Sequence, residues 1–260
     1  MWTITRFSGM IDSEKMMYFE EKISMYVSIL GDSVSTLAGR NPEGYQVFYQ
    51  GAVCELSGVR GYGDTWWGQV TDALGGELLV NNSWSGSRVT KLPDLDELFP
   101  SGCSDERTGG LHRGDILPDI IFVCMGINDW GYRAAMYPNS VLEDTEAFQT
   151  AYGLMLKKLR RNYPDAQIWC IGIHPARMSQ NDSYSFPKRL FSVSLSTVNG
   201  IIAEAAAQNG CRSITFDSHK TLPHDSIDGT HPNRSGMTEL ANLIIGEMAA
   251  QGQEFPALSD

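Results

Sequence analysis

Five short apolar runs recur along the chain, each followed by a longer amphipathic segment. They are rich in Val and Ile and mostly lack the apolar–polar alternation of a half-exposed strand. Such runs are typical of parallel strands that are covered on both faces. We therefore predict strands within residues 26–30, 77–80, 120–125, 168–173 and 213–216.

The segments between these runs carry the spacing of amphipathic helices. Apolar residues recur at i, i+4, i+7 and i+11 from Phe148 to Leu159, and this helix should end before Pro164. Similar patterns predict helices within residues 64–74, 190–208 and 237–248. Because strands and helices alternate, we predict crossover connections and a parallel sheet in an α/β fold.

Two stretches interrupt the alternation. Residues 41–63 are rich in Gly, Tyr and Gln, and residues 92–118 are polar, so both are predicted to be surface loops or excursions. No repeat or Pro/Gly/Ser linker divides the chain. We expect a single domain over residues 23–260, preceded by an N-terminal extension, residues 1–22, that packs on the domain or flanks it.

Polar residues and glycines follow four of the apolar segments. In open α/β sheets, ligands bind outside the carboxyl ends of the strands, so these residues should converge on one edge. Each motif also has a simple structural interpretation. Ser33 could cap a helix, and Asp228 followed by Gly229 could form a turn. The four motifs lie within residues 31–35, 81–88, 126–130 and 228–233.

Taken together, these residues supply what acyl transfer needs. The reaction requires an activated hydroxyl, a base, a group that orients the base, and an oxyanion hole. Ser33 offers the hydroxyl, His231 the base, and Asp228 lies three residues before that base. Asn128 offers a side-chain donor, and Gly86 a backbone N–H without a side chain in the way.

At these positions the chain resembles the SGNH hydrolases, also called the GDSL esterase/lipase family. The four blocks of that family occur in order, and the resemblance extends from residue 26 to about residue 249. Val34 replaces the Leu of the GDSL name. The blocks are Gly31-Asp32-Ser33, Asn81 to Ser85-Gly86, Gly126 to Asn128-Asp129, and Asp228 to His231.

The resemblance implies a flavodoxin-like, three-layer α/β/α sandwich around about five parallel strands in the order 2-1-3-4-5. It also implies ester hydrolysis without a metal or another cofactor. Ser33 would be the nucleophile, His231 the general base and Asp228 its orienting partner. The backbone N–H groups of Ser33 and Gly86 and the side chain of Asn128 would form the oxyanion hole.

The substrate is less defined than the reaction. Trp84, Trp130, Tyr132 and His174 are candidate substrate contacts because they lie near the motifs, whereas Trp66 and Trp67 favour core packing. An aromatic rim suits a sugar face or a small acyl group, so we expect a small-acyl esterase that acts on a carbohydrate or glycoside. A lysophospholipase or thioesterase for longer chains is the alternative, and a non-catalytic binding protein or a nucleotide-binding protein is less favoured.

The composition limits the partners and the compartment. A formal net charge of −11 over 260 residues argues against nucleic-acid binding and against docking on anionic lipid. No run of ~18 to 20 apolar residues is present, as a membrane-spanning helix would require. The N-terminal residues contain no signal-peptide pattern, so a cytoplasmic location is expected.

The remaining cysteines and histidines suggest no second chemistry. The five cysteines form no CxxC pair or zinc-like cluster, and we expect free thiols, with a Cys54–Cys103 bridge as the main exception. His112, His219 and His224 are predicted to be solvated loop residues.

Overall fold

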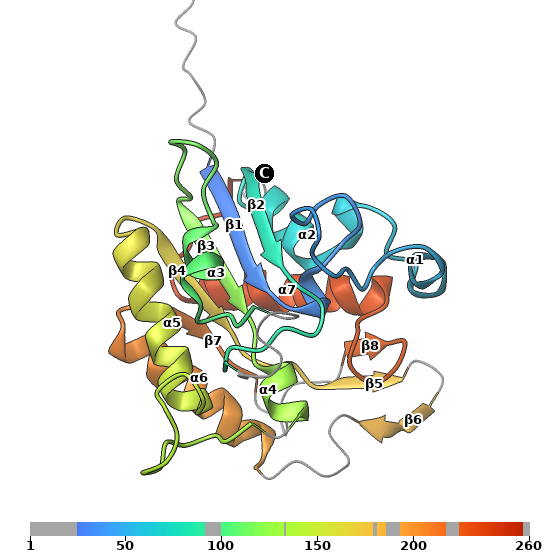
Figure 1. Ribbon diagram of the computed structural model, residues 1–260. Helices are drawn as coiled ribbons and strands as arrows, with labels where there is room; N and C mark the ends of the chain where they lie inside the picture. The colour runs from blue at the N-terminus through green and yellow to red at the C-terminus, as the bar shows by residue number, and fades with distance from the viewer. Residues whose placement is uncertain are drawn as a thin grey trace, which may run out of the picture.

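Five parallel strands form the central layer of the protein in the computed structural model (Figure 1). Their order across the sheet is β2-β1-β3-β4-β7, and every pairing is parallel. This confirms the predicted order, and each strand overlaps one of the predicted apolar runs. The strands are β1 (Met25–Gly31), β2 (Gly76–Ser83), β3 (Ile120–Cys124), β4 (Gln167–Ile171) and β7 (Arg212–Ile214).

Most of the predicted domain is covered by the structure. The N-terminal extension, residues 1–22, and His219 lie outside the described residues. No helix within the described ranges is both long enough and apolar enough to cross a membrane. The structure describes residues 25–91, 100–132, 134–178, 181–185, 193–216 and 224–256.

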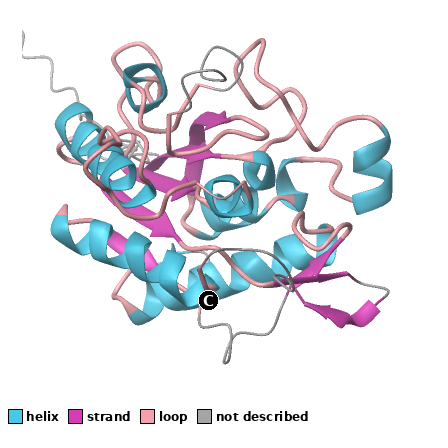
Figure 2. Cartoon of the chain, turned by 60° about the horizontal axis from the view of Figure 1, so that its bottom comes forward, coloured by secondary structure: helices cyan, strands magenta, loops and turns pink. Residues whose placement is uncertain are grey.

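Helices cover both faces of the sheet and complete the three layers (Figure 2). On one face lie α5 (Phe148–Asn162) and α6 (Leu195–Gln208), which contact each other. On the other face lie α2 (Trp66–Ala73) and α7 (Arg234–Ala250), which also contact each other. The structure therefore confirms the α/β/α sandwich.

The strands lack alternation because both of their faces are buried. In β3, Ile121 and Val123 join the core under α5 and α6. Ile120 and Phe122, one residue out of phase, join the core under α2 and α7. Successive side chains of a strand point to opposite faces, so a strand between two helical layers needs apolar residues at every position.

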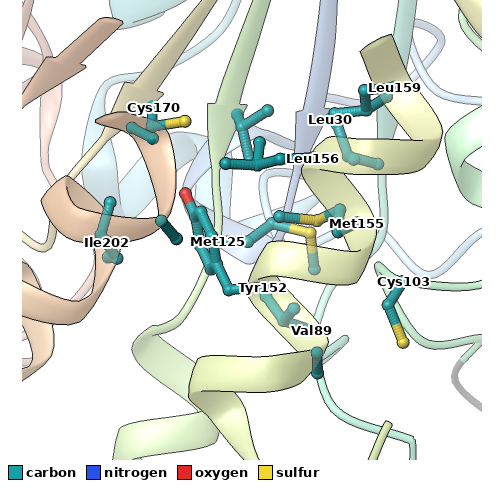
Figure 3. Packing of buried hydrophobic residues seen from close by; sticks show 14 of the residues in the cluster. Leu30, Val89, Cys103, Met125, Tyr152, Met155, Leu156, Leu159, Cys170 and Ile202 are labelled. Carbon is teal, nitrogen blue, oxygen red and sulfur yellow. The ribbon is translucent and has the colours of Figure 1, made fainter. Parts of the chain in front are cut away.

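The apolar stripe of α5 is a clear example of sequence-directed packing. Tyr152, Met155 and Leu156 project from this helix toward the sheet, near Leu30 and Cys170 (Figure 3). The helix ends at Asn162, before Pro164, as its sequence predicted.

The two excursions hold short helices rather than loops alone. Residues 41–63 contain α1 (Ala52–Ser57) and most of the 3₁₀ helix η2 (Tyr62–Asp64), and residues 92–118 contain α3 (Asp105–Gly109). Arg107 of α3 is fully buried and donates to the backbone oxygens of Gly31 and Asn82. The second excursion is therefore tied to the carboxyl ends of β1 and β2, which a simple surface loop would not be.

A second, three-stranded sheet has the order β6-β5-β8. It consists of β5 (Ala176–Met178), β6 (Asn181–Ser185) and β8 (His224–Ser226). In β5 and β8, Ala176 pairs with His224 in a parallel register. This sheet was not predicted, because its strands are short and two of them carry no apolar run. It places His224 inside the protein, so the prediction of a solvated His224 was wrong.

All five cysteines are free, as predicted, and no bridge joins Cys54 to Cys103. Cys103 and Cys170 are buried among apolar side chains, where a thiol packs as a small hydrophobic group.

Candidate active site

The four polar motifs meet at the carboxyl edge of the main sheet. Ser33 begins the 3₁₀ helix η1 (Ser33–Ser35) directly after β1, and Gly86 lies in the turn after β2. Asn128 lies in α4 (Ile127–Gly131) after β3. Asp228 and His231 lie between β8 and α7. The main sheet brings the first three segments together because its parallel strands end on the same side, whereas the fourth segment follows β8 of the second sheet.

Ser33, His231 and Asp228 form a continuous hydrogen-bonded chain. The Ser33 Oγ lies 2.8 Å from His231 Nε2, and Asp228 Oδ2 lies 2.7 Å from His231 Nδ1. A carboxylate only accepts, so Nδ1 carries the proton and Nε2 is free to accept from the serine hydroxyl. This is the arrangement of a hydroxyl nucleophile with its general base and an orienting carboxylate.

Asp228 is kept ionised by the loop around it. Partial burial works against its charge, but hydrogen bonds and the nearby ring of His231 outweigh burial and lower the pKa of Asp228. Its Oδ1 accepts from the backbone N–H groups of Thr230 at 3.0 Å and His231 at 2.8 Å. One carboxylate therefore holds both the backbone and the ring of His231.

The residues that follow His231 explain how this loop is held in place. Asn233 caps α7 by accepting from the N–H of Gly236 at 2.9 Å. A Cβ on Gly236 would lie 1.9 Å from the carbonyl oxygen of Asp225, so only glycine lets the helix approach β8 this closely. These contacts give a structural reason for Asn233 and Gly236, which follow the fourth block in the sequence.

The nucleophile sits in an equally tight turn. Asp32, before Ser33, accepts from the N–H of Val34 at 3.1 Å and caps η1. A Cβ on Gly31 would lie 2.6 Å from Ser83 Oγ, so the chain has room only for glycine there. Burial raises the pKa of Asp32 to about 7, so this carboxyl group is partly protonated near neutral pH.

Two of the three predicted oxyanion donors, Asn128 and Gly86, are tied together through Ser87. Asn128 Nδ2 donates to the carbonyl oxygen of Ser87 at 2.9 Å, next to Gly86. An amide nitrogen carries two hydrogens, so one remains for a ligand. Gly86 adopts a φ of +83°, a left-handed conformation that glycine adopts without strain.

Asp129 belongs to the third block, but the sequence assigned it no role; in the structure it is a buried carboxylate that holds two loops together. It is fully buried and accepts from the N–H of Val89 at 2.9 Å and from both the N–H (2.9 Å) and the Oγ1 (2.7 Å) of Thr90. Burial raises the pKa of Asp129, while these hydrogen bonds partly offset that rise. Asp129 thus joins the Gly86 turn to α4, and its position beside Asn128 was the only sequence signal.

The other described histidines have different surroundings. His174 and His224 are 8% and 3% exposed, and their Nδ1 atoms lie 2.7 Å apart. His174 Nδ1 also lies 2.7 Å from the carbonyl oxygen of Pro175, so His174 donates and His224 accepts. His174, a candidate substrate contact, is therefore largely enclosed, whereas His112 is exposed, as predicted.

The aromatic residues near the motifs differ in how deeply they are buried and in what they contact. Trp130 is buried, and its indole N–H donates to the carbonyl oxygen of Val193. Tyr132 is 66% exposed, with the guanidinium of Arg88 over its ring. Trp84 lies against Tyr45, at 4.2 Å between ring centroids. Trp66 and Trp67 are fully buried, consistent with core packing.

A cavity of about 40 Å³ lies at the carboxyl edge of the main sheet, and Ser33, Asp228 and His231 are not among the residues that line it. Its walls include Val34, Ile127 and Thr230, each next in sequence to a residue of the proposed catalytic machinery. His174 and His224 also line the cavity. Among the described residues, no group of three or more His, Cys, Asp or Glu side chains is placed to hold a metal ion.

The fold and this site together define a class of flavodoxin-like α/β proteins with a serine, a histidine and an aspartate joined at the end of the first strand. Comparison with known families is consistent with that class. The model of the GDSL-like lipase/acylhydrolase family matches residues 25–201, which is more than half of the chain. The chain belongs to this family.

Solved structures show the same fold. A protein from Bacteroides uniformis ATCC 8492, described as a GDSL-like lipase, shares 24% identity with a TM-score of 0.67, over 88% of this chain and 98% of that chain. A similar protein from Bacteroides ovatus ATCC 8483 shares 22% identity with a TM-score of 0.66, over 87% and 99%.

A third structure is Est24, a carbohydrate acetylesterase from Sinorhizobium meliloti. It shares 15% identity with a TM-score of 0.57, over 88% of this chain and 100% of that chain. No curated protein matches the sequence at a significant level.

Proposed function

We propose that the protein is a serine esterase that removes a small, acetyl-like acyl group from a carbohydrate or glycoside. The observation that carries this proposal is the hydrogen-bonded chain from Ser33 through His231 to Asp228. Membership of the GDSL-like lipase/acylhydrolase family supports ester hydrolysis as the reaction class.

The reaction proceeds by double displacement. His231 Nε2 takes the proton of Ser33 while Oγ attacks the ester carbonyl carbon. The N–H groups of Ser33 and Gly86 and the amide of Asn128 bind the oxygen as it becomes negative. Loss of one such donor costs roughly 10²- to 10³-fold in kcat, because the donors act on charge that develops in the transition state.

The second half of the reaction uses the same groups. Protonated His231 gives its proton to the leaving alcohol, and the ester C–O bond breaks to leave an acyl-Ser33. His231 then takes a proton from water, which attacks the acyl group; the bond to Ser33 Oγ breaks, His231 returns the proton to Oγ, and the acid is released. Asp228 keeps Nδ1 protonated throughout and stabilises the imidazolium.

We assign the acyl group to the cavity lined by chain neighbours of the triad, and the size of that cavity favours a short acyl group. Its 40 Å³ hold about three water-sized groups, which corresponds to a chain of a few carbon atoms. Its walls are mostly apolar, so a methyl or ethyl group can replace water there at low cost. The apolar side chains are Val34, Met125, Ile127, Ile171, Ile173 and Leu240.

The exposed aromatic residues that follow α4 suggest the chemistry of the leaving group. Tyr132 and Tyr137 follow α4 in the chain and are largely exposed. Exposed aromatic faces are suited to the apolar face of a sugar ring. The similarity to a carbohydrate acetylesterase from Sinorhizobium meliloti favours the same substrate class.

A series of nitrophenyl esters tests the proposal. We expect the highest kcat/KM for acetate or propionate and a steep fall for longer chains, because a longer chain overfills the cavity. A maximum at eight carbons or more would instead support the lysophospholipase or thioesterase alternative.

The serine provides the matching control. We expect Ser33→Ala to abolish turnover of nitrophenyl acetate and to prevent labelling by a fluorophosphonate. Labelling of wild type but not of Ser33→Ala separates an enzyme from a binding protein on the same fold. Activity of Ser33→Ala close to that of wild type would remove Ser33 from its assigned role.

A further inference from the structure

The first excursion, residues 41–63, crosses the active site and contacts both of its sides. The ring of Tyr45 lies against Trp84 beside the Gly86 turn, and the carbonyl oxygen of Gln46 accepts from Ser85 N–H at 2.8 Å. Farther along, the hydroxyl of Tyr49 donates to the carbonyl oxygen of Pro232 at 2.7 Å. One short segment thus joins the oxyanion side to the histidine side.

Phe48, in the middle of that segment, covers one face of the His231 ring. The two ring centroids are 3.5 Å apart, and the rings are nearly parallel, with an interplanar angle of 12°. The edges of the imidazole are held by Ser33 and Asp228. His231 is thus fixed at two ring nitrogens and on one face, and only 15% of its side chain is exposed.

The backbone of Phe48 is anchored to the nucleophile itself. Its N–H donates to Thr36 Oγ1 at 2.9 Å, and Thr36 Oγ1 donates to the carbonyl oxygen of Ser33 at 2.9 Å. Tyr49 packs edge-on against the Phe48 ring at 5.1 Å and supports it from behind. The contacts form a closed circuit from Ser33 through Thr36 and Phe48 to His231 and back to Ser33.

We infer that Phe48 is a positioning residue that holds His231 in the orientation required for proton transfer; this rests on the proposed esterase function. A stacked ring blocks rotation of the imidazole out of line with Ser33 Oγ. Its π face also attracts the imidazolium that forms during the reaction. No motif of the family includes Phe48, which lies 15 residues after the nucleophile.

The test compares Phe48→Leu with Phe48→Tyr. Leucine keeps the apolar bulk and removes the ring, whereas tyrosine keeps the ring. Because such ring contacts contribute modestly, Phe48→Leu should lower kcat for nitrophenyl acetate by about 3- to 30-fold, with KM nearly unchanged. Phe48→Tyr should keep most of the wild-type kcat.

A matched control comes from the same excursion. Tyr62 is also a half-buried aromatic residue, but it packs on Trp67 and not on His231. Tyr62→Leu should leave kcat within about twofold of wild type once folding is verified by thermal unfolding. A general loss of aromatic packing would lower kcat equally in both leucine variants.

Proton NMR tests whether Phe48 fixes the ring of His231, without relying on turnover. The Nδ1 proton between His231 and Asp228 should give a low-field resonance that exchanges slowly in wild type and in Phe48→Tyr, and faster in Phe48→Leu. If wild type hydrolyses no ester, the proposed function fails, and this resonance still decides whether Phe48 orders His231.

Three results would overturn the inference. The first is an unchanged kcat together with an unchanged resonance in Phe48→Leu. The second is a rise in KM alone, which would make Phe48 a substrate contact. The third is an equal loss of kcat in Phe48→Leu and Phe48→Tyr, which would show that the ring itself does not matter.

Discussion

His231 and the pair formed by His174 and His224 show how surroundings give the same side chain opposite properties. His231 is joined to a carboxylate and a hydroxyl and keeps contact with solvent. His174 and His224 face each other inside the protein. His231 therefore has the partners that the proposed proton transfer needs, whereas, among the described residues, the other two have only each other and backbone groups as hydrogen-bond partners.

Burial keeps the other two histidines neutral. Desolvation lowers the pKa of His174 to about 4, and desolvation together with the neighbouring His174 lowers the pKa of His224 to about 3. A charged imidazole in that place would lose its hydration and gain no carboxylate in return. The comparison teaches that burial without a carboxylate partner keeps a histidine neutral, whereas His231 has both a carboxylate partner and contact with solvent.

The largest expected effect comes from removing the base. His231→Ala should lower kcat for nitrophenyl acetate by about 10⁶-fold, since the serine is no longer activated. The midpoint of thermal unfolding should fall by only about 2–4 °C. His112→Ala removes an exposed histidine and should change neither quantity, so comparable activity losses in the two variants would contradict the assignment.

Removing the partner of His231 should have the next largest effect. Asp228→Asn preserves shape but takes away the charge and favours the wrong tautomer of the ring. We expect kcat to fall by about 10⁴-fold, as measured with the same ester. A loss smaller than tenfold would mean that the backbone contacts of Asp228, and not its charge, are what matter.

The smallest expected effect is a pH dependence of the free energy of unfolding that comes from the buried pair His174 and His224. The folded-state pKa of His224 lies below 6.5, its ordinary value, so the unfolded chain binds the proton first as the pH falls. The stabilisation is complete above that value and is lost as the pH drops toward the folded pKa. One such group contributes a slope of up to about 1.4 kcal/mol per pH unit.

Urea unfolding of wild type and His224→Gln between pH 7 and pH 4.5 measures this slope. The variant should lose stability less steeply as the pH falls. Asp32 acts in the opposite direction because its pKa is raised to about 7, so the difference between the two proteins is the relevant quantity. Parallel curves for both proteins would show that His224 is not kept neutral by the fold.

The sequence predicted the main sheet and the triad for different reasons. The strands were visible because full burial demands apolar residues at every position, as in β3. The site was visible because glycines, a serine and the Asp228–His231 pair recur after successive strands. No Cβ has room at Gly31 or Gly236, which gives a physical reason for the glycine at each of these two positions.

The parts that were missed depend on contacts between distant segments. His224 was expected in solvent because no apolar run surrounds it, yet β5 and β8 enclose it. Asp129 and Arg107 are buried charges whose hydrogen-bond partners come from other loops. A charged residue in a polar stretch looks the same in sequence whether it is solvated or satisfied internally.

By itself, the sequence determined the α/β alternation and the family blocks, and it singled out the three residues proposed as the triad, because these depend on local periodicity and on short motifs. Only the tertiary structure decided that Phe48 stacks on His231 and that two histidines become a neutral pair beside the cavity. Those outcomes depend on which side chains exclude water from one another across the folded chain. That exclusion is set by the packing of all the elements together.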